Sequence, residues 1–330
     1  MLAILLNARH LAGVFILGFS LCVGLSGCAL VLPQTTALRE VKPAGLPDQV
    51  ELQETPFVAQ SDYQCGPAAL SMLLTPHRPE IKLEELIQQV YLPGRQGSLQ
   101  VEMLAAPRRH GLVSYPLAPR LEDVMREVAA GNPVIVLQNF GLWPVSLWHY
   151  AVVIGYDYPK GELILRSGEK RRLLMPFEVM EYIWEDGGYW SMVVVPPEKI
   201  PVTAAAQPYL ESVAALERVK QNAAAKTAYQ SALQRWPDSV TARLGLSNTH
   251  HALGELKQAE DVLRRALEIQ PDSVIFLNNL AQTLSDLGRN AEALTLVDQA
   301  LSLGGPYMKA VSETRAQILQ RDPRLAPRSP

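Results

Sequence analysis

Residues 50–198 carry two successive patterns of apolar and polar positions. In the first half, apolar residues recur with helical spacing, which predicts helices over 66–74, 82–90, 100–109 and 121–130. In the second half, short runs rich in β-branched and aromatic residues predict strands over 134–138, 148–156, 163–166 and 190–195. Helices followed by an antiparallel meander indicate an α+β domain.

The C-terminal part of the chain repeats itself with a step of 34 residues. The segment Trp236-Pro237-Asp238-Ser239 recurs as Gln270-Pro271-Asp272-Ser273, and Leu253-Gly254 recurs as Leu287-Gly288. Two sets of alanines and one slot for a larger apolar residue keep the same step: Ala225, Ala259 and Ala293; Ala232, Ala266 and Ala300; Tyr229, Leu263 and Val297. This pattern resembles the tetratricopeptide repeat, which implies an all-α domain of paired helices over 208–320. Residues 307–319 are expected to form the helix that caps its open end.

By repeat position, the first helix of each pair faces a concave groove, and four polar residues fall on that face: Asn248, His251, Asn278 and Gln282. Amide side chains there are able to bind the backbone of a peptide from a partner protein. The alternative is that these side chains are only solvated.

Composition and charge exclude several classes of protein. The chain of 330 residues is 48% hydrophobic and 19% charged, which is typical of a packed protein rather than a disordered one. Its net charge is −3, and no block of Lys and Arg occurs, so nucleic acid is not expected as a partner. Three cysteines, Cys22, Cys28 and Cys65, are too few for a disulfide framework.

The N-terminus has the pattern of an export signal. An apolar run over 11–25 is too short for a comfortable membrane span, and it ends in Leu25-Ser26-Gly27-Cys28. This quartet resembles the lipobox of bacterial lipoproteins, which implies cleavage before Cys28 and lipidation of that cysteine. Ala29 in the next position implies the outer membrane, facing the periplasm. An ordinary signal sequence is the alternative.

The chain is therefore expected to comprise six segments. A signal peptide over 1–27 and a tether over 28–50 precede the α+β domain over 51–198. A linker over 199–207 leads to the repeats over 208–320, and a frayed tail covers 321–330.

Cys65 is the cysteine that the lipoprotein signal does not explain. It precedes Gly66 and Pro67, a pair that suits the start of a helix. A helix N-terminus favours the thiolate, so we expect a reactive Cys65 with a lowered pKa. The alternative is a buried structural thiol.

The segments Gln60 to Leu70 and Trp148 to Asp157 together resemble the C39-like cysteine peptidases, which are papain-like enzymes. The resemblance covers about residues 55–195. It implies that Cys65 is the nucleophile and that His149 is the general base that later protonates the leaving amine. It also implies that Gln60 donates its amide to the oxyanion together with the N–H of Cys65, with Gln64 as the second candidate for that donor.

The third member of the catalytic group departs from the family pattern. Asp157 is about 26 Å from His149 along an extended strand at ~3.3 Å per residue, so it is expected to be a turn residue. The family's orienting Asp or Asn aligns with Ser167, which supplies no charge. Glu169 replaces it if the hairpin register is shifted. A neutral residue in this position leaves open a catalytically inactive peptidase-like scaffold that only binds.

Metal ligands and cofactor motifs are not expected. The remaining histidines are scattered, and neither a His-Glu-x-x-His segment nor a Gly-rich phosphate loop occurs. The sequence thus predicts a lipid-anchored thiol hydrolase that acts on a peptide or amide bond, without metal or cofactor, followed by repeats that recruit a protein.

Overall fold

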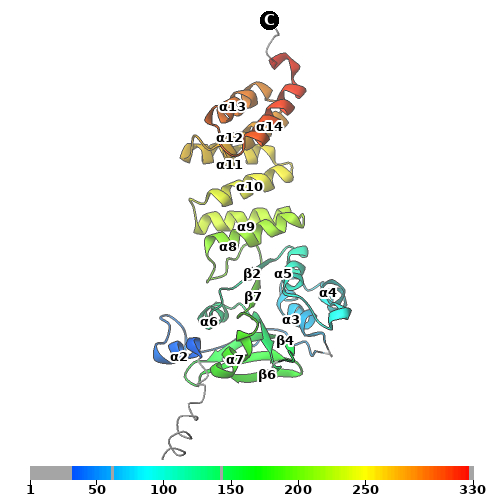
Figure 1. Cartoon of the computed structure of the whole chain (residues 1–330), viewed down its shortest axis with the longest axis vertical. Helices are drawn as coiled ribbons and strands as arrows, with labels where there is room; N and C mark the ends of the chain where they lie inside the picture. The colour runs from blue at the N-terminus through cyan, green and yellow to red at the C-terminus, as the bar shows by residue number, and fades with distance from the viewer. Residues whose placement is uncertain (1–31, 61–62, 142–143, 327–330) are drawn as a thin grey trace, which may run out of the picture.

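The computed structural model describes residues 32–60, 63–141 and 144–326. It consists of a sheet domain and a stack of helices that extends from it along the long axis of the molecule (Figure 1). The predicted signal peptide and Cys28 lie outside the described residues. Among the residues that are described, no helix is both long and apolar enough to cross a membrane.

The sheet is antiparallel and has seven strands. Its strands are β1 (Gln49–Glu51), β2 (Val113–Pro116), β3 (Val134–Asn139), β4 (Trp148–Asp157), β5 (Glu162–Ser167), β6 (Lys170–Pro176) and β7 (Ser191–Val195). Their order is β2-β7-β3-β4-β5-β6, and the short β1 pairs with the far end of β4. Strands β3, β4 and β5 are almost entirely buried because helices cover both faces of the sheet.

Helices pack on the two faces in two groups. The elements are α2 (Pro33–Glu40), α3 (Cys65–Leu74), α4 (Leu83–Val90), the short η1 (Pro93–Arg95), α5 (Gln100–Arg109), α6 (Leu121–Ala129) and α7 (Phe177–Glu185). One apolar core joins α3, α4 and α5 to one face of the sheet, and a second joins α6 and α7 to the other. The predicted α+β class is confirmed, with all four predicted helices and all four predicted strands present.

Besides α2 and the short η1, four elements of the sheet domain were not predicted: β1, β2, β6 and α7. Strand β6 is an edge strand whose first half is exposed, so its sequence shows no apolar alternation. Helix α7 starts directly after it at Phe177, without a turn residue between them. The simple meander is also incomplete, because β7 returns to lie between β2 and β3.

The predicted tether is folded from Leu32 onwards. Helix α2 packs against α6 and α7, with Leu38 buried. The fully buried carboxylate of Glu181 accepts hydrogen bonds from the backbone N–H groups of Gln34 (2.8 Å) and Thr35 (2.6 Å). These N–H groups belong to the first turn of α2, where they lack partners within the helix, and a carboxylate satisfies them. The part of the predicted tether that forms α2 is therefore part of the folded domain.

The repeats form seven helices in the described residues. They are α8 (Ala206–Arg218), α9 (Asn222–Arg235), α10 (Val240–Ala252), α11 (Leu256–Ile269), α12 (Val274–Asp286), α13 (Asn290–Leu303) and α14 (Met308–Arg321). The alanines that keep the 34-residue step are buried between paired helices, as predicted. Gly245 shows how tight the packing is, because a Cβ there would lie 2.2 Å from the ring of Tyr229. Helix α14 caps the stack at the expected place.

The segment expected to be a linker joins the two parts rigidly. Glu127 is fully buried and accepts hydrogen bonds from both the N–H (2.7 Å) and the hydroxyl (2.6 Å) of Thr203. The ring of Tyr209 on α8 lies 6.4 Å from that of Tyr115 on β2. One apolar core runs from the sheet into α8, α9 and α10 without a break. The predicted linker over 199–207 is therefore packed against the sheet domain.

The tail is ordered at its start. Arg321, the last residue of α14, bonds Ser285 (3.0 Å) and pairs with Asp286 on α12. A short turn of helix, η2 (Pro323–Leu325), follows it. The prediction of a frayed tail is therefore wrong for residues 321–325, and residues 327–330 lie outside the described residues.

Candidate active site

Cys65 is the first residue of α3, and its neighbours explain why the chain turns there. A Cβ on Gly66 would lie 2.4 Å from the hydroxyl oxygen of Ser98, so a larger residue would push the helix away from that segment. Pro67 occupies the first turn, where a missing N–H costs nothing. Nine of the ten residues of α3 are buried, and this fixes the position of the half-buried Cys65.

The thiol of Cys65 lies against strand β4. Burial raises the pKa of Cys65 above its ordinary value, while hydrogen bonds from the backbone N–H groups of Tyr150, Gly66 and Cys65 itself oppose this rise. The expectation of a lowered pKa from the helix N-terminus is wrong, because the loss of water around the thiol outweighs the N–H groups. The contact with Tyr150 also places the thiol beside the residue that follows His149.

His149 is the second residue of β4, at the end of the strand where the sheet opens. Its Nε2 lies 2.9 Å from the hydroxyl oxygen of Ser167 on β5. Its ring packs against that of Phe140, with 5.7 Å between the centroids and 49° between the planes. Burial lowers the pKa of His149 to about 4, so the imidazole is neutral at pH 7. The structure thus brings Ser167 to the ring, as the alignment with the family pattern predicted.

Glu169 is not placed to replace Ser167. Ser167 and Lys170 are paired across the β5–β6 hairpin, and Gly168 and Glu169 form the two-residue loop between them. The φ of Gly168 is +57°, which this tight loop requires at its first position. Glu169 is exposed at the tip of the loop. The β5–β6 register is irregular between Leu165 and Ser167, but Ser167 and not Glu169 contacts the imidazole, so the alternative orienting role of Glu169 is wrong.

Gln60 lies beside the same hairpin loop. Its backbone N–H donates to the carbonyl of Gly168 (3.3 Å), and its side-chain Oε1 accepts from the N–H of Gly168 (3.2 Å). The Nε2 of Gln60 is buried and has no hydrogen-bond partner among the described residues. A buried amide that keeps a free donor is what stabilisation of an oxyanion needs. Gln64, the second candidate, directly precedes α3 and is half-buried.

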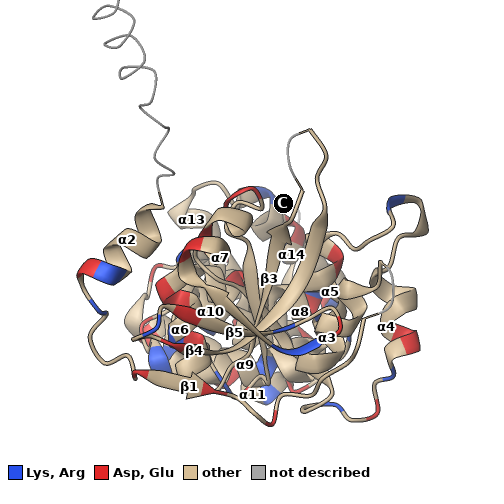
Figure 2. Ribbon diagram, turned by 90° about the horizontal axis from the view of Figure 1, so that it is seen from below, with Lys and Arg blue, Asp and Glu red and all other residues tan. Residues whose placement is uncertain are grey.

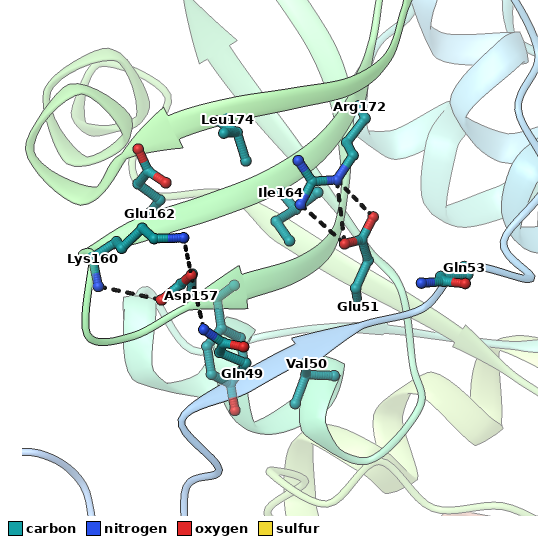
Figure 3. A pocket seen from close by; sticks show the side chains of 11 residues that line it. Gln49, Val50, Glu51, Gln53, Asp157, Lys160, Glu162, Ile164, Arg172 and Leu174 are labelled. Carbon is teal, nitrogen blue, oxygen red and sulfur yellow. Dashed lines mark hydrogen bonds and ion pairs between the residues drawn. The ribbon is translucent and has the colours of Figure 1, made fainter.

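Asp157 is a turn residue, as expected. It ends β4, and its side chain pairs with Lys160 (2.7 Å) and accepts from Gln49 (3.0 Å). These residues line a pocket of about 330 Å³ over β1 and the far ends of β4 and β5 (Figure 3). On the opposite side of this pocket, Arg172 pairs with Glu51. This pocket is at the end of β4 remote from His149, so it is separate from the site around Cys65.

Asn139 and Phe140 were missed in the sequence. Asn139 ends β3 and is paired with Trp148 at the start of β4, and Phe140 directly follows it. The segment Asn139-Phe140-Gly141 between two strands signals a turn but carries no signal of a site. Figure 2 shows α3, α4 and α5 on one side of β3, and α2 and α6 on the other.

The four groove residues divide into two kinds. His251 and Gln282 are engaged within the chain, since both bind Asp286, at 2.7 Å and 3.3 Å. Burial alone would raise the pKa of Asp286, but the hydrogen bonds from His251, Arg321 and Gln282 hold it below its ordinary value. Asp286 and Arg321 are therefore two groove residues that sequence reasoning missed.

The other two predicted groove residues differ in exposure. Asn248 is exposed and accepts a hydrogen bond from Asn279 (3.1 Å). The Oδ1 of Asn278 is buried, and the described part of the chain offers it no partner. Three or more His, Cys, Asp or Glu side chains in a metal-binding arrangement do not occur within residues 32–60, 63–141 and 144–326.

Comparisons with known proteins agree with this architecture. Residues 52–168 match the model of the Peptidase_C39 like family. Residues 216–276 and 262–295 match two models of the tetratricopeptide repeat. A comparison with curated protein sequences finds no match.

Two solved structures are similar to part of the chain. A putative C39-like peptidase from Bacillus anthracis is 19% identical, with a TM-score of 0.38, over 45% of this chain and 98% of that one. A double glycine motif protease from an AMS/PCAT transporter, solved with its leader peptide, is 20% identical, with a TM-score of 0.34, over 44% and 93%. The chain thus combines an α+β sheet domain, in which residues 52–168 match the Peptidase_C39 like family, with a run of helices that match tetratricopeptide repeats.

Proposed function

We propose that this protein is a thiol hydrolase that cleaves a peptide or amide bond, with Cys65 as the nucleophile and His149 as the base. The observation that carries the proposal is the 2.9 Å contact between His149 Nε2 and Ser167. If Nε2 carries its proton and donates it to the hydroxyl oxygen, the lone pair of Nδ1 is left to accept a proton. The thiol of Cys65, beside the next backbone amide of β4, is the group that supplies this proton.

The reaction starts from a neutral pair, since the pKa of His149 is about 4 and that of Cys65 is raised. The proton of the thiol moves to Nδ1 of His149 as the sulfur attacks the carbonyl carbon. The C–N bond then breaks, and the imidazolium returns its proton to the leaving amine. Water, activated by the neutral imidazole, hydrolyses the thioester, and the carboxylate product leaves with the thiol restored.

Gln60 stabilises the negative oxygen that forms during each attack. Its unpartnered Nε2 and the N–H of Cys65 are the two donors of this role. The two hydrogen bonds between Gln60 and Gly168 link this donor to the loop next to Ser167. The donor and the orienting hydroxyl are thereby held by one hairpin.

The remaining parts of the chain determine where the reaction takes place. A lipid on Cys28 holds the protein at the bacterial envelope, on the outer membrane facing the periplasm. Only residues 29–32 separate Cys28 from the folded helix α2, so the lipid is attached close to the sheet domain. The repeats recruit a protein partner, and the rigid junction through Glu127 and Thr203 supports a fixed distance between that partner and Cys65.

A second candidate function is a peptidase-like scaffold that binds without catalysis. The neutral Ser167 and the raised pKa of Cys65 favour it, because neither stabilises the charges that form during attack. The two functions differ in how fast Cys65 reacts with an electrophile that is shaped like a substrate.

A peptide-based electrophilic probe for thiol hydrolases distinguishes them. The full chain in detergent is incubated with the probe, and intact-mass spectrometry counts the adducts. The thiol hydrolase forms one adduct that the Cys65→Ala variant does not form, at a rate well above that of a simple alkylating agent of equal intrinsic reactivity. Equal rates for the two reagents would indicate the scaffold.

A further inference from the structure

Asn139, the last residue of β3, has a side chain whose hydrogen-bonding capacity is fully used. Its Oδ1 accepts from the backbone N–H groups of Gly141 (3.0 Å) and Leu147 (2.8 Å). Its Nδ2 donates to Asp186 after α7 (2.9 Å) and to the hydroxyl of Ser146 (3.5 Å). A carboxamide has two acceptor and two donor positions, and all four have a partner here. Asn139 is 7% exposed, so water does not compete for these partners.

These bonds hold both ends of the loop between β3 and β4 together. The N–H of Phe140 also donates to the carbonyl of Leu147 (3.0 Å). A Cβ on Gly141 would lie 2.0 Å from the carbonyl oxygen of Val145, which shows how closely the two sides approach. Burial of apolar side chains contributes little to this closure, because Val145 is 71% exposed and Leu147 is 60% exposed.

The closed loop sets the surroundings of His149. Phe140 is the first residue after Asn139, and its ring covers the imidazole at 5.7 Å. Burial is the cause of the low pKa of His149. Two titratable groups contact neighbours of the ring: the thiol of Cys65 accepts from the backbone N–H of Tyr150, and Asp186 accepts from the side chain of Asn139.

We propose that Asn139 is a positioning residue: by closing the β3–β4 loop it keeps Phe140 against His149, so that the imidazole stays dry and faces Ser167. This inference deepens the proposed function. Only its catalytic consequence rests on that function, namely that a neutral His149 is ready to accept the thiol proton. The link from Asn139 to the imidazole is a property of the folded chain and is measured without a substrate.

The test is hydrogen–deuterium exchange at the imidazole C2 position, read by mass spectrometry on the full chain in detergent, which gives the pKa of each histidine separately. Asn139→Ala is expected to raise the pKa of His149 by about one unit or more, towards the ordinary value of ~6.5, because water enters when the loop opens. The pKa of His77, which burial also lowers, serves as the internal reference and stays unchanged. An unchanged pKa of His149 in a folded Asn139→Ala protein overturns the proposal.

Three further variants locate the effect. Phe140→Ala is expected to raise the pKa of His149 in the same way, and adding Asn139→Ala to it should bring little further change, because both act through the same ring. Asn132→Ala removes another buried asparagine, bonded to Glu127 at the other end of β3, and should leave His149 unaffected. Fully additive shifts, or an equal shift in Asn132→Ala, overturn the proposal.

If Asn139→Ala does not fold, Asp186→Ala takes its place. Asp186 is exposed, so its truncation leaves the core intact, but it removes one of the partners that hold the Asn139 carboxamide. A smaller rise in the pKa of His149 is then expected, and it should disappear in the background of Phe140→Ala. No rise, or a rise that persists in that background, counts against the role of Asn139.

Discussion

The hydroxyl of Ser167 lies 2.9 Å from Nε2 of His149, in the position where the family pattern has an Asp or Asn. This contact links β5 to the end of β4 and orients the imidazole without adding a negative charge. A hydroxyl fixes which nitrogen carries the proton, but it does not stabilise the imidazolium that forms during attack.

Substitutions at Ser167 separate the effect of orienting the imidazole from the effect of a negative charge beside it. Ser167→Ala removes one neutral hydrogen bond, worth about 0.5–1.5 kcal/mol, so the rate of Cys65 acylation should fall about two- to tenfold. Ser167→Asp should keep or raise that rate, since a carboxylate stabilises the imidazolium. The measurement is the pseudo-first-order rate of probe acylation at pH 7. Glu169→Gln is the control in the neighbouring loop and should have no effect; a severe loss there would contradict the assignment.

The pH dependence of Cys65 alkylation tests the neutral resting state. Because burial raises the pKa of the thiol, the thiolate fraction at pH 7 should not exceed the ~3% of a free cysteine. A raised pKa means that the thiolate appears only as the pH rises further, so the rate with iodoacetamide should climb through pH 7 to 9 without a plateau. A plateau that is already reached below pH 7 would instead show a preformed thiolate–imidazolium pair.

The lipid anchor is tested by Cys28→Ser. This variant should leave the membrane fraction for the soluble envelope fraction, or remain unprocessed, because the acceptor for the lipid is lost. Cys22→Ser is the matched control, since it lies in the segment expected to be removed, and it should fractionate as the wild type. Normal processing and membrane recovery of Cys28→Ser would refute the anchor.

The shared core between the sheet and the repeats predicts the effect of truncation. A chain of residues 32–198 lacks α8, α9 and α10 and exposes apolar residues of β2 and α6 that they cover. It should unfold at a clearly lower temperature than a chain of residues 32–253, which keeps these three helices. Differential scanning calorimetry of the two chains measures the difference. Equal melting temperatures would mean that the domains are independent.

Sequence reasoning succeeded where the signal is local or periodic. The 34-residue step predicted the packing of Ala225 and its equivalents, and the β-rich run from Trp148 to Tyr156 predicted β4. The position of Ser167 also followed from the strand pattern.

Sequence reasoning failed where tertiary contacts determine the position or the chemistry of a residue. The docking of α2 depends on the buried Glu181, which is 146 residues from Thr35 in sequence. The raised pKa of Cys65 depends on burial by β4, and a sequence motif shows the helix N-terminus but not the loss of water around it. Asn139 is likewise an ordinary turn residue until Asp186 and Leu147 are placed around it.

The acylation rate of Cys65 in a His149→Ala variant tests the central claim most directly. If His149 takes the thiol proton, His149→Ala should be slowed by orders of magnitude, nearly to the background of Cys65→Ala, since members of a catalytic group act together. Circular dichroism confirms that each variant is folded, and the peptide-based probe reports the rate. A His149→Ala protein that retains half of the wild-type rate would contradict the account, because another group would then be the base.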